Sequence, residues 1–470
     1  MMSVPSARAS IATKILRIGL VAVVLATIIP YGAVSPSWFY AAAFMNGLVF
    51  AATLAIPFRN MDLLRVYRTA VVVLLLVIAY LVFQSAHLPG NAFAHSIWET
   101  VRSPLGVASG TISVNPAGTL ASIPLIVHPF LIFMGVLVLH QTNEPAVSFW
   151  KQLCFIGAAI AAFGLLQYFV FPDKLLFEQK LHYLDSVTGT LVNRNSAATL
   201  FGVAALMIAA MLVRQFGELR MYEPPGDDEP QDAREHQVLL LFYAGLFIVV
   251  LVALFLTHSR GGLIASFPPL LLLAAWFGYS LLPTGAWRGF RFGIAAAAAT
   301  GLVFLFTVLG ARSLFRIEQG GTDDNRWCVY QSTIAAIRDN LWLGTGFGTF
   351  EQVFPIYRDP ECGISGLWDR AHNSFLEGYL GMGVPFAIAL LFVVGYLVTI
   401  FVSGYGARRR YRIVPLTGVA ILILILLHSG VDFSLQIPGV AAYVAAALGA
   451  AVAISLARKR SNRDAITELR

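Results

Sequence analysis

The chain has 470 residues, of which 58% are hydrophobic and 12% are charged. A soluble chain of this length needs far more charge to cover its surface, so the composition predicts a polytopic membrane protein and excludes an ordinary soluble one. The net charge of +7 comes from 32 basic and 25 acidic residues. In a membrane protein such an excess reports topology, and because the basic residues are scattered over many short loops we do not expect nucleic-acid binding.

About twelve apolar segments have the roughly 20 residues that a helix needs to cross the hydrocarbon core of a bilayer. We expect helices, because a lipid-embedded backbone must satisfy its own hydrogen bonds and the sequence shows no barrel-like alternation. The prediction is an all-α polytopic membrane protein that forms a single membrane domain over residues 1–470, with about 12 transmembrane helices. The predicted segments are residues 18–34, 38–58, 69–87, 121–140, 152–171, 196–213, 238–257, 263–282, 290–310, 374–402, 413–429 and 437–457.

Basic residues in the short loops predict which side of the membrane each loop faces. A cytoplasmic N-terminus places most of the 32 Lys and Arg residues inside, among them the cluster at residues 408–412. The first apolar segment is interpreted as a retained signal anchor, because its removal would leave an odd number of spans. Both termini are then cytoplasmic, and so is the polar, proline-containing loop at residues 214–237, whose composition is typical of disorder.

One polar stretch, residues 311–373, interrupts the apolar pattern on the opposite side of the membrane, and we call it the long periplasmic loop. Between Asn325 and Asp339 its apolar residues recur at three- and four-residue steps, which predicts an amphipathic helix on the membrane. The loop is also rich in arginine, whose planar fork binds phosphate oxygens in a bidentate manner. The candidate binding arginines are Arg312, Arg316, Arg326 and Arg370.

Two of the three cysteines, Cys328 and Cys362, fall in the long periplasmic loop. An oxidising periplasm would allow them to form a disulfide, but two unrelated thiols are an equally good interpretation of the sequence. Cys154 lies inside an apolar segment and is expected to be a small core residue.

Three further features face the periplasm in this topology: Asn193-Arg194-Asn195, Ser259-Arg260-Gly261 and His372-Asn373. A diphosphate at a bilayer surface needs fixed positive charge, which Arg194 and Arg260 would supply. Gly261 would let the backbone approach an anion at the start of a helix. His372 can accept a proton from a sugar hydroxyl near neutral pH. We therefore predict that the three features converge into one site.

Each of these features also has a structural interpretation. A single arginine at a helix end usually reaches lipid phosphates, and a single histidine at a helix mouth is more often structural than catalytic. We expect His128 and His428 to be structural or pore-lining. Glu377 lies just inside a predicted span, where a carboxylate is costly unless it is paired. It is therefore expected to pair with Arg370, Arg194 or Arg260, or to help hold His372.

In their order and spacing these features resemble the O-antigen ligase and polymerase superfamily. The resemblance covers residues 189–394 and includes Asn-Arg-Asn at a span start, Ser-Arg-Gly-Gly at an outer turn, and a long loop that ends in His-Asn-x-x-x-Glu. It implies a GT-C-like, metal-independent, inverting glycosyltransferase of the bacterial inner membrane that needs no cofactor. Arg194 and Arg260 match the arginines thought to hold a donor diphosphate, and His372 matches the essential loop histidine, placed near the acceptor hydroxyl.

The resemblance implies an undecaprenyl-diphosphate-linked glycan as donor and either lipid A core or a growing polysaccharide as acceptor, within membrane lipids. An O-antigen or exopolysaccharide polymerase remains an alternative to a ligase, and a polytopic transporter or lipid flippase is the alternative from another class. The predicted catalytic residues are Arg194, Arg260 and His372. The predicted substrate-binding residues are Asn193, Asn195, Ser259, Gly261, Arg312, Arg316, Arg326, Arg370, Asn373 and Glu377.

Overall fold

The computed structural model describes residues 7–106, 109–219, 231–281, 293, 323–360, 366–408 and 411–457. The predicted segment 290–310, apart from Gly293, lies outside the described residues. So do Arg312, Arg316 and Cys362, together with the part of the long periplasmic loop before Asp323.

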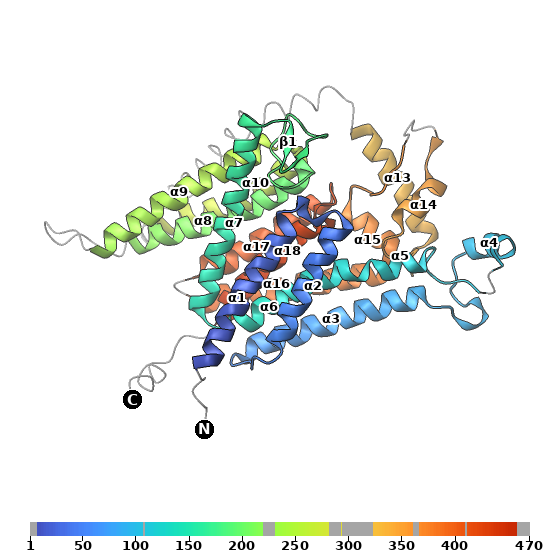
Figure 1. Cartoon of the computed structure of the whole chain (residues 1–470), viewed down its shortest axis with the longest axis horizontal. Coiled ribbons are helices and arrows are strands. Elements are labelled where there is room, and N and C mark those ends of the chain that lie inside the picture. Colours follow the sequence, from blue (N-terminus) through green and yellow to red (C-terminus); the bar gives the residue numbers. More distant parts are fainter. Residues whose placement is uncertain are drawn as a thin grey trace.

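The described chain is almost entirely helical (Figure 1). Its N-terminal part contains α1 (Ala7–Ile28), η1 (Tyr31–Ala33), α2 (Pro36–Thr53), α3 (Met61–Ser85), η2 (Pro89–Asn91), α4 (Ile97–Leu105), α5 (Pro116–Ala121), α6 (Ile123–Leu139) and α7 (Asn143–Val170). A short antiparallel hairpin, β1 (Lys174–Leu175) and β2 (Glu178–Gln179), precedes α8 (Arg194–Leu219), α9 (Gln231–Leu256) and α10 (Arg260–Leu281). The C-terminal part contains α13 (Asp323–Asp339), α14 (Phe350–Tyr357), α15 (Ser374–Met382), α16 (Val384–Ala407), α17 (Ile413–Ser429), η4 (Ser434–Gln436) and α18 (Pro438–Leu456).

Two helices, α8 and α18, form the interior of the bundle. In each of them 83% of the apolar window is buried, whereas the corresponding share is 17% in α16 and 22% in α3. Small residues allow the central helices to approach closely. This is usual in membranes, because lipid is as apolar as leucine and helices therefore associate through close packing. A Cβ built on Gly202 of α8 would lie 2.4 Å from Ser266 Oγ of α10, and one on Gly262 of α10 would lie 2.3 Å from the Cβ of Ala198. The start of α10 is therefore pressed against the first turns of α8.

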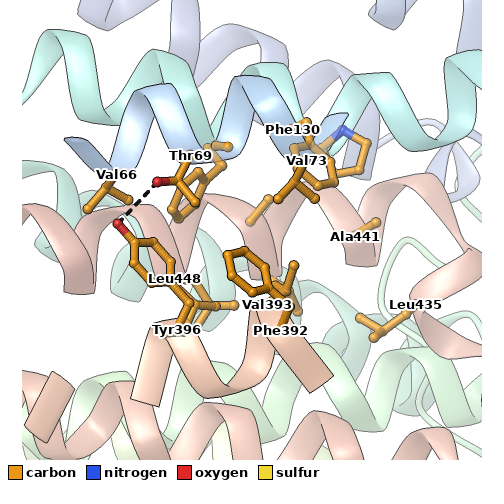
Figure 2. A pocket seen from close by; sticks show the side chains of 16 residues that line it. Val66, Thr69, Val73, Phe130, Phe392, Val393, Tyr396, Leu435, Ala441 and Leu448 are labelled. Carbon is orange, nitrogen blue, oxygen red and sulfur yellow. Dashed lines mark hydrogen bonds between the residues drawn. The ribbon is translucent and has the colours of Figure 1, made fainter. Parts of the chain in front are cut away.

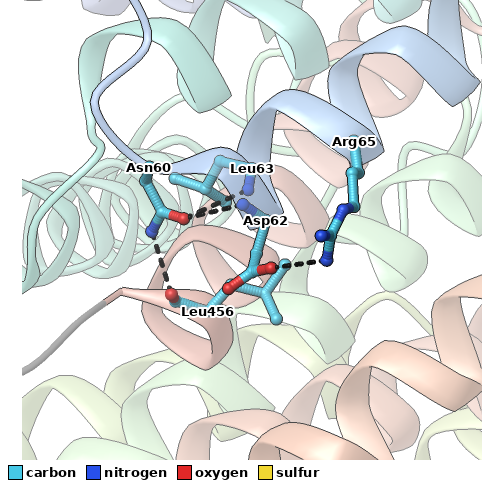
Figure 3. A network of polar contacts seen from close by, with 5 residues as sticks. All are labelled: Asn60, Asp62, Leu63, Arg65 and Leu456. Atoms are coloured by element: carbon cyan, nitrogen blue, oxygen red, sulfur yellow. Dashed lines mark hydrogen bonds and ion pairs between the residues drawn. The ribbon is translucent and has the colours of Figure 1, made fainter.

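Helix α3 begins at a side-chain cap that also ties it to the end of α18 (Figure 3). Asn60 Oδ1 accepts hydrogen bonds from the backbone N–H groups of Asp62 and Leu63, at 3.0 and 3.3 Å. Its Nδ2 donates to the carbonyl of Leu456 at 2.9 Å. Asp62 pairs with Arg65 at 2.9 Å, on an exposed surface where such a pair adds little stability. One asparagine thus satisfies unpaired N–H groups at a helix start and fixes the contact between α3 and α18.

The segment from α13 to α15 lies together at one end of the bundle, opposite the start of α1 (Figure 1). The glycines at positions 344, 346 and 348 have positive φ angles of 70°, 99° and 81°, which favour glycine. They turn the chain back onto the end of α15, where Thr345 N donates to Leu380 O at 2.8 Å and Gly346 N donates to Gly381 O at 3.0 Å. This glycine run is therefore a turn that anchors α15.

The sequence predictions of helices hold over most of the described chain. Nine described helices are long and apolar enough to cross a membrane, and they correspond to nine of the predicted segments. Two more predicted segments form α2 and the shorter apolar helix α17. The predicted segment 374–402 is divided at Gly383 into α15 and α16, because Gly383 has a φ of 64°. An all-α multi-pass membrane protein is confirmed, whereas the number of about 12 spans stays a prediction.

A helix, α13, forms where the amphipathic helix was predicted, but only part of the predicted apolar stripe faces the protein. Tyr330 and Ile337 are half-buried and Ile337 packs on the loop, whereas Ile334 is exposed. Val329, Thr333 and Ala336 are buried against the rest of the loop, whereas Trp327 is 62% exposed. Small side chains allow α13 to pack closely on its neighbours, and the bulky tryptophan faces away. Whether that outer face lies on the membrane stays a prediction.

Candidate functional site

Each of the three predicted features forms the N-terminal cap of a helix. Asn193 precedes α8 and its Oδ1 accepts a hydrogen bond from Asn195 N at 2.7 Å. Ser259 precedes α10 and its Oγ accepts from Gly262 N at 3.1 Å. Asn373 precedes α15, and its Oδ1 accepts from the N–H groups of Phe375 and Leu376 at 3.0 and 3.1 Å. The polar residue types in these motifs therefore have a local structural cause, because they satisfy N–H groups that have no partner within the helix.

Hydrogen bonds join these three helix starts, directly between α8 and α10 and through Gly430 and Asp432 to α15. Ser259 Oγ donates to Asn195 Oδ1 at 2.8 Å, which links the start of α10 to the start of α8. Asn195 Nδ2 donates to Asp432 Oδ1 at 2.9 Å, and Ser374 Oγ, in the first turn of α15, donates to the carbonyl oxygen of Asp432 at 3.0 Å. Asn373 Nδ2 donates to Gly430 O at 2.7 Å. Residues far apart in the sequence thus meet around the connection between α17 and η4.

Asp432 is the centre of this network, and the sequence analysis did not select it. It is 1% exposed, and besides Asn195 its carboxylate accepts a hydrogen bond from the hydroxyl of Ser434. A buried carboxylate is stable only when it is hydrogen-bonded or paired, and both side-chain oxygens are bonded here. The signal available in the sequence was an acidic residue between two apolar segments, on the side of the membrane predicted for the other motifs.

His372 lies immediately before the cap of α15 and has a left-handed backbone, with a φ of 52°. Its carbonyl oxygen accepts a hydrogen bond from the hydroxyl of Tyr330 at 2.9 Å. The ring packs edge-on against Phe433 and Trp368, with centroid distances of 4.9 and 5.6 Å. The Nδ1 atom is buried and has no hydrogen-bond partner among the described residues.

Burial lowers the pKa of His372 below its usual range, and the positive charge of Arg326 lowers it further. The carboxylates of Asp432 and Asp369 act in the opposite direction. A histidine with a lowered pKa is neutral at neutral pH, the form in which it can accept a proton. The ring is therefore held half-buried and neutral beside the start of α15 and Phe433.

The predicted arginines lie around the network in different ways. Arg194 is the first residue of α8 and its guanidinium lies over the ring of Tyr183, 5.0 Å from the centroid. Arg260 is the first residue of α10. Arg326 of α13 donates to the carbonyl of Val431 at 3.4 Å, which brings the long loop to the residue next to Asp432. Arg312 and Arg316 lie outside the described residues.

Glu377 pairs with Arg370 and helps to hold the backbone before His372. Arg370 Nη1 lies 3.2 Å from Glu377 Oε1, and Ala371 N donates to Glu377 Oε2 at 2.9 Å. Because Glu377 is only 9% exposed, these two contacts compensate for the removal of its charge from water. The pair fixes the segment that carries His372, which is a positioning role.

The cysteines and possible metal ligands can be described in part. Cys154 is a free, buried thiol, as expected for a core residue. Cys328 takes part in a disulfide, and Cys362, the remaining cysteine, lies outside the described residues. Among the described residues no group of three or more His, Cys, Asp or Glu side chains has an arrangement that would hold a metal ion.

Two cavities lie away from the Asp432 network. One of about 290 Å³ lies between α3, α6, α16 and α18 (Figure 2), and its lining is apolar apart from Thr69 and Tyr396, whose hydroxyls contact each other at 3.4 Å. Such a cavity suits hydrocarbon and offers no group for a phosphate. The other, of about 830 Å³, is lined by polar residues such as Lys151 and Arg408 at helix ends predicted to be cytoplasmic.

Comparison with known proteins identifies the family. The model of a family described as O-antigen ligase matches residues 245–391. This region runs from the middle of α9 into α16 and contains Arg260, Arg326, His372 and Glu377, whereas Arg194 precedes it. No curated protein matches the chain. The family indicates glycan transfer in the assembly of lipopolysaccharide or other polysaccharides. The match over residues 245–391 confirms the resemblance of the motifs to the O-antigen ligase and polymerase superfamily.

Proposed function

We propose that the protein transfers a glycan from an undecaprenyl-diphosphate-linked donor to an acceptor sugar hydroxyl at the periplasmic face of the inner membrane. The observation that carries this proposal is the meeting of three helix N-termini, those of α8, α10 and α15, around Asp432. A helix N-terminus has a positive field that favours anions, and the caps described above satisfy only some of the N–H groups in each first turn. Arg194 and Arg260 begin two of these helices and add the fixed charge that a diphosphate requires.

In the proposed reaction His372 acts as general base. It accepts the proton of the acceptor hydroxyl while the hydroxyl oxygen forms a bond to the anomeric carbon of the donor. The bond between that carbon and the diphosphate oxygen breaks on the opposite face, so the configuration inverts. The electron pair and the negative charge pass to the diphosphate, where Arg194 and Arg260 stabilise them. The resulting imidazolium lies near the carboxylates of Asp432 and Asp369, which favour the charged form.

The test is transfer by the purified full-length protein, with lipid-linked glycan, acceptor and no nucleotide. We expect turnover that persists in EDTA, because fixed cationic side chains replace a metal in this proposal. His372→Ala in the same preparation serves as the control for contaminating activity. Transfer that stops in EDTA and returns with a divalent cation would contradict the metal-independent reaction.

The acceptor separates the two candidate activities. Cells that lack the protein should accumulate long unligated lipid-linked chains if it is a ligase, and single lipid-linked repeats if it is a polymerase. Movement of intact lipid-linked glycan across vesicles, without bond exchange, would instead indicate a transporter or flippase. The concentration of predicted site residues at one membrane face supports a transferase, since a transporter is expected to carry polar residues near the midplane of both halves.

A further inference from the structure

A second histidine, His428, lies at the same network but was expected to be structural or pore-lining. It occupies the last turn of α17 and is 2% exposed. Its Nδ1 atom forms a hydrogen bond with Thr199 Oγ1 of α8. Its Nε2 atom is buried and has no hydrogen-bond partner among the described residues. A buried polar atom without a partner is costly, so this nitrogen points to a further contact.

The unpartnered nitrogen faces the first turn of α10. A Cβ built on Gly261, the second residue of that helix, would lie 3.4 Å from both Nε2 and Cδ2 of His428. The same Cβ would lie 3.0 Å from Val431. Because position 261 has no side chain, the edge of the imidazole lies close to the backbone of the N-terminal turn. His428 is thus placed beside the helix start that Arg260 begins.

The contact with Thr199 indicates which nitrogen carries the ring proton. The hydroxyl of Thr199 has one hydrogen and two neighbouring acceptors, the carbonyl of Asn195 at 3.3 Å and Nδ1 of His428, which is closer. When the hydroxyl donates to the closer acceptor, the ring proton of neutral His428 lies on Nε2. Nε2–H is then a hydrogen-bond donor directed toward the start of α10.

The charged groups around this ring are those that surround His372. Asp432 and Arg326 are the two charged residues that act on His428, and both also act on His372. The two histidines therefore share the same charged neighbours. His428 belongs to α17, and His372 belongs to the long periplasmic loop. They differ in depth, because His428 is fully buried and His372 is half-buried.

We propose that His428 is a further binding residue for the donor diphosphate and that its Nε2–H donates to a phosphate oxygen at the first turn of α10. A buried N–H donor next to a helix N-terminus and an arginine suits an anion with several oxygen atoms. This inference rests on the proposed function, since it assigns a residue to the same donor. It places His372 at the acceptor side and His428 at the leaving-group side of the reaction.

The matched variants His428→Gln and His428→Asn test the inference. The amide nitrogen of glutamine reaches the position of Nε2, whereas that of asparagine reaches only the position of Nδ1. Binding of undecaprenyl diphosphate to purified full-length protein is measured as a Kd. We expect His428→Asn to raise the Kd about 10-fold, the effect of one lost hydrogen bond to a charged group. His428→Gln should stay near the wild-type value.

The opposite pattern, with His428→Asn near wild type and His428→Gln weakened, would show that only the bond to Thr199 matters and would overturn the inference. Unchanged binding in both variants would also overturn it. If neither variant folds, Gly261→Ala keeps His428 but places a methyl group between Nε2 and the helix start, and it should raise the Kd to a similar extent. Wild-type Kd in that variant would overturn the inference.

Failure of this inference and failure of the proposed function give different results. Lack of glycan transfer by the wild-type protein would contradict the function, and it is measured without any His428 variant. The Kd for undecaprenyl diphosphate tests His428 in the absence of transfer. His128→Asn is the control for altering a buried histidine elsewhere, and it should leave this Kd unchanged.

Discussion

Two buried histidines, His128 and His428, differ in how their ring nitrogens are hydrogen-bonded. Each is 2% exposed. His128 of α6 has both ring nitrogens bonded, Nε2 to Thr27 Oγ1 and Nδ1 to Asn46 Nδ2, each at 3.1 Å. His428 has only Nδ1 bonded among the described residues.

The difference separates a structural histidine from one placed in a site. Thr27 donates its own hydrogen to Val23 O and therefore accepts from His128 Nε2, while the amide nitrogen of Asn46 can only donate. Both ring nitrogens of His128 thus already have hydrogen-bond partners, so neither is available to a ligand. The cluster around Asp432 contains His372 and His428, and each of these rings has one nitrogen without a partner in the described chain. Burial alone does not distinguish His128 from His428, whereas the hydrogen bonds of their ring nitrogens do.

The largest expected effect belongs to His372. His372→Ala should lower kcat by about 10²- to 10⁴-fold, the range for loss of a general base. The measurement is single-turnover transfer with saturating lipid-linked donor, next to a thermal unfolding curve. Activity within a few-fold of wild type would remove His372 from the mechanism.

Asp432→Asn should have the next largest effect. The amide keeps the shape of the side chain but loses the negative charge that both histidines and Asn195 face, so we expect kcat to fall by about 10- to 100-fold. Transfer rate and unfolding temperature are measured together. A variant that loses stability but keeps the wild-type kcat would show that the carboxylate only supports the fold.

Arg326→Ala should shift the pH dependence of kcat/KM without a large change in its maximal value. Because the pKa of His372 is lowered, kcat/KM should stay level from neutral pH to below pH 6.5 and fall only when the ring becomes protonated. Arg326 lowers that pKa, so Arg326→Ala should raise it and move the acid limb to higher pH. A limb that does not move, or that moves to lower pH, would contradict the assignment of this limb to His372.

The smallest effect on transfer is expected for the structural histidine. His128→Ala should leave kcat and KM within about twofold of wild type, while it reduces the free energy of unfolding by about 1–3 kcal/mol because Thr27 and Asn46 lose their partner. Thermal unfolding in detergent together with the transfer assay checks both statements. A kcat that falls as far as in the His372 variant would contradict a purely structural role for His128.

The helices were predictable because long apolar runs leave few alternatives in a membrane. The sequence missed the break inside segment 374–402, where the apolar pattern continues through Gly383 although the backbone there turns, with a φ of 64°. The buried face of α13 was predicted only in part. The spacing of apolar residues pointed to Ile337, which packs on the loop, and to Trp327, which is exposed, but not to the buried Val329 and Ala336.

For the site, the sequence indicated which residues face one side of the membrane but not which atoms touch. Asn195 and Ser259 were selected as neighbours of arginines, yet their contacts are with each other and with Asp432. Asp432 was missed because a single acidic residue in a short loop usually faces water. It is buried because α17, η4 and α8 pack together. These elements are far apart in the sequence, so their contact was not predictable.

The long loop is fastened to the connection between α17 and η4 by contacts that do not involve substrate. Asn373 binds the carbonyl of Gly430, Arg326 binds that of Val431, and His372 packs on Phe433. A chimera that carries only the loop of a relative would therefore lose matched contacts between the loop and residues 430–433. A chimera is therefore expected to keep these contacts only when residues 323–373 and 429–437 are transplanted together.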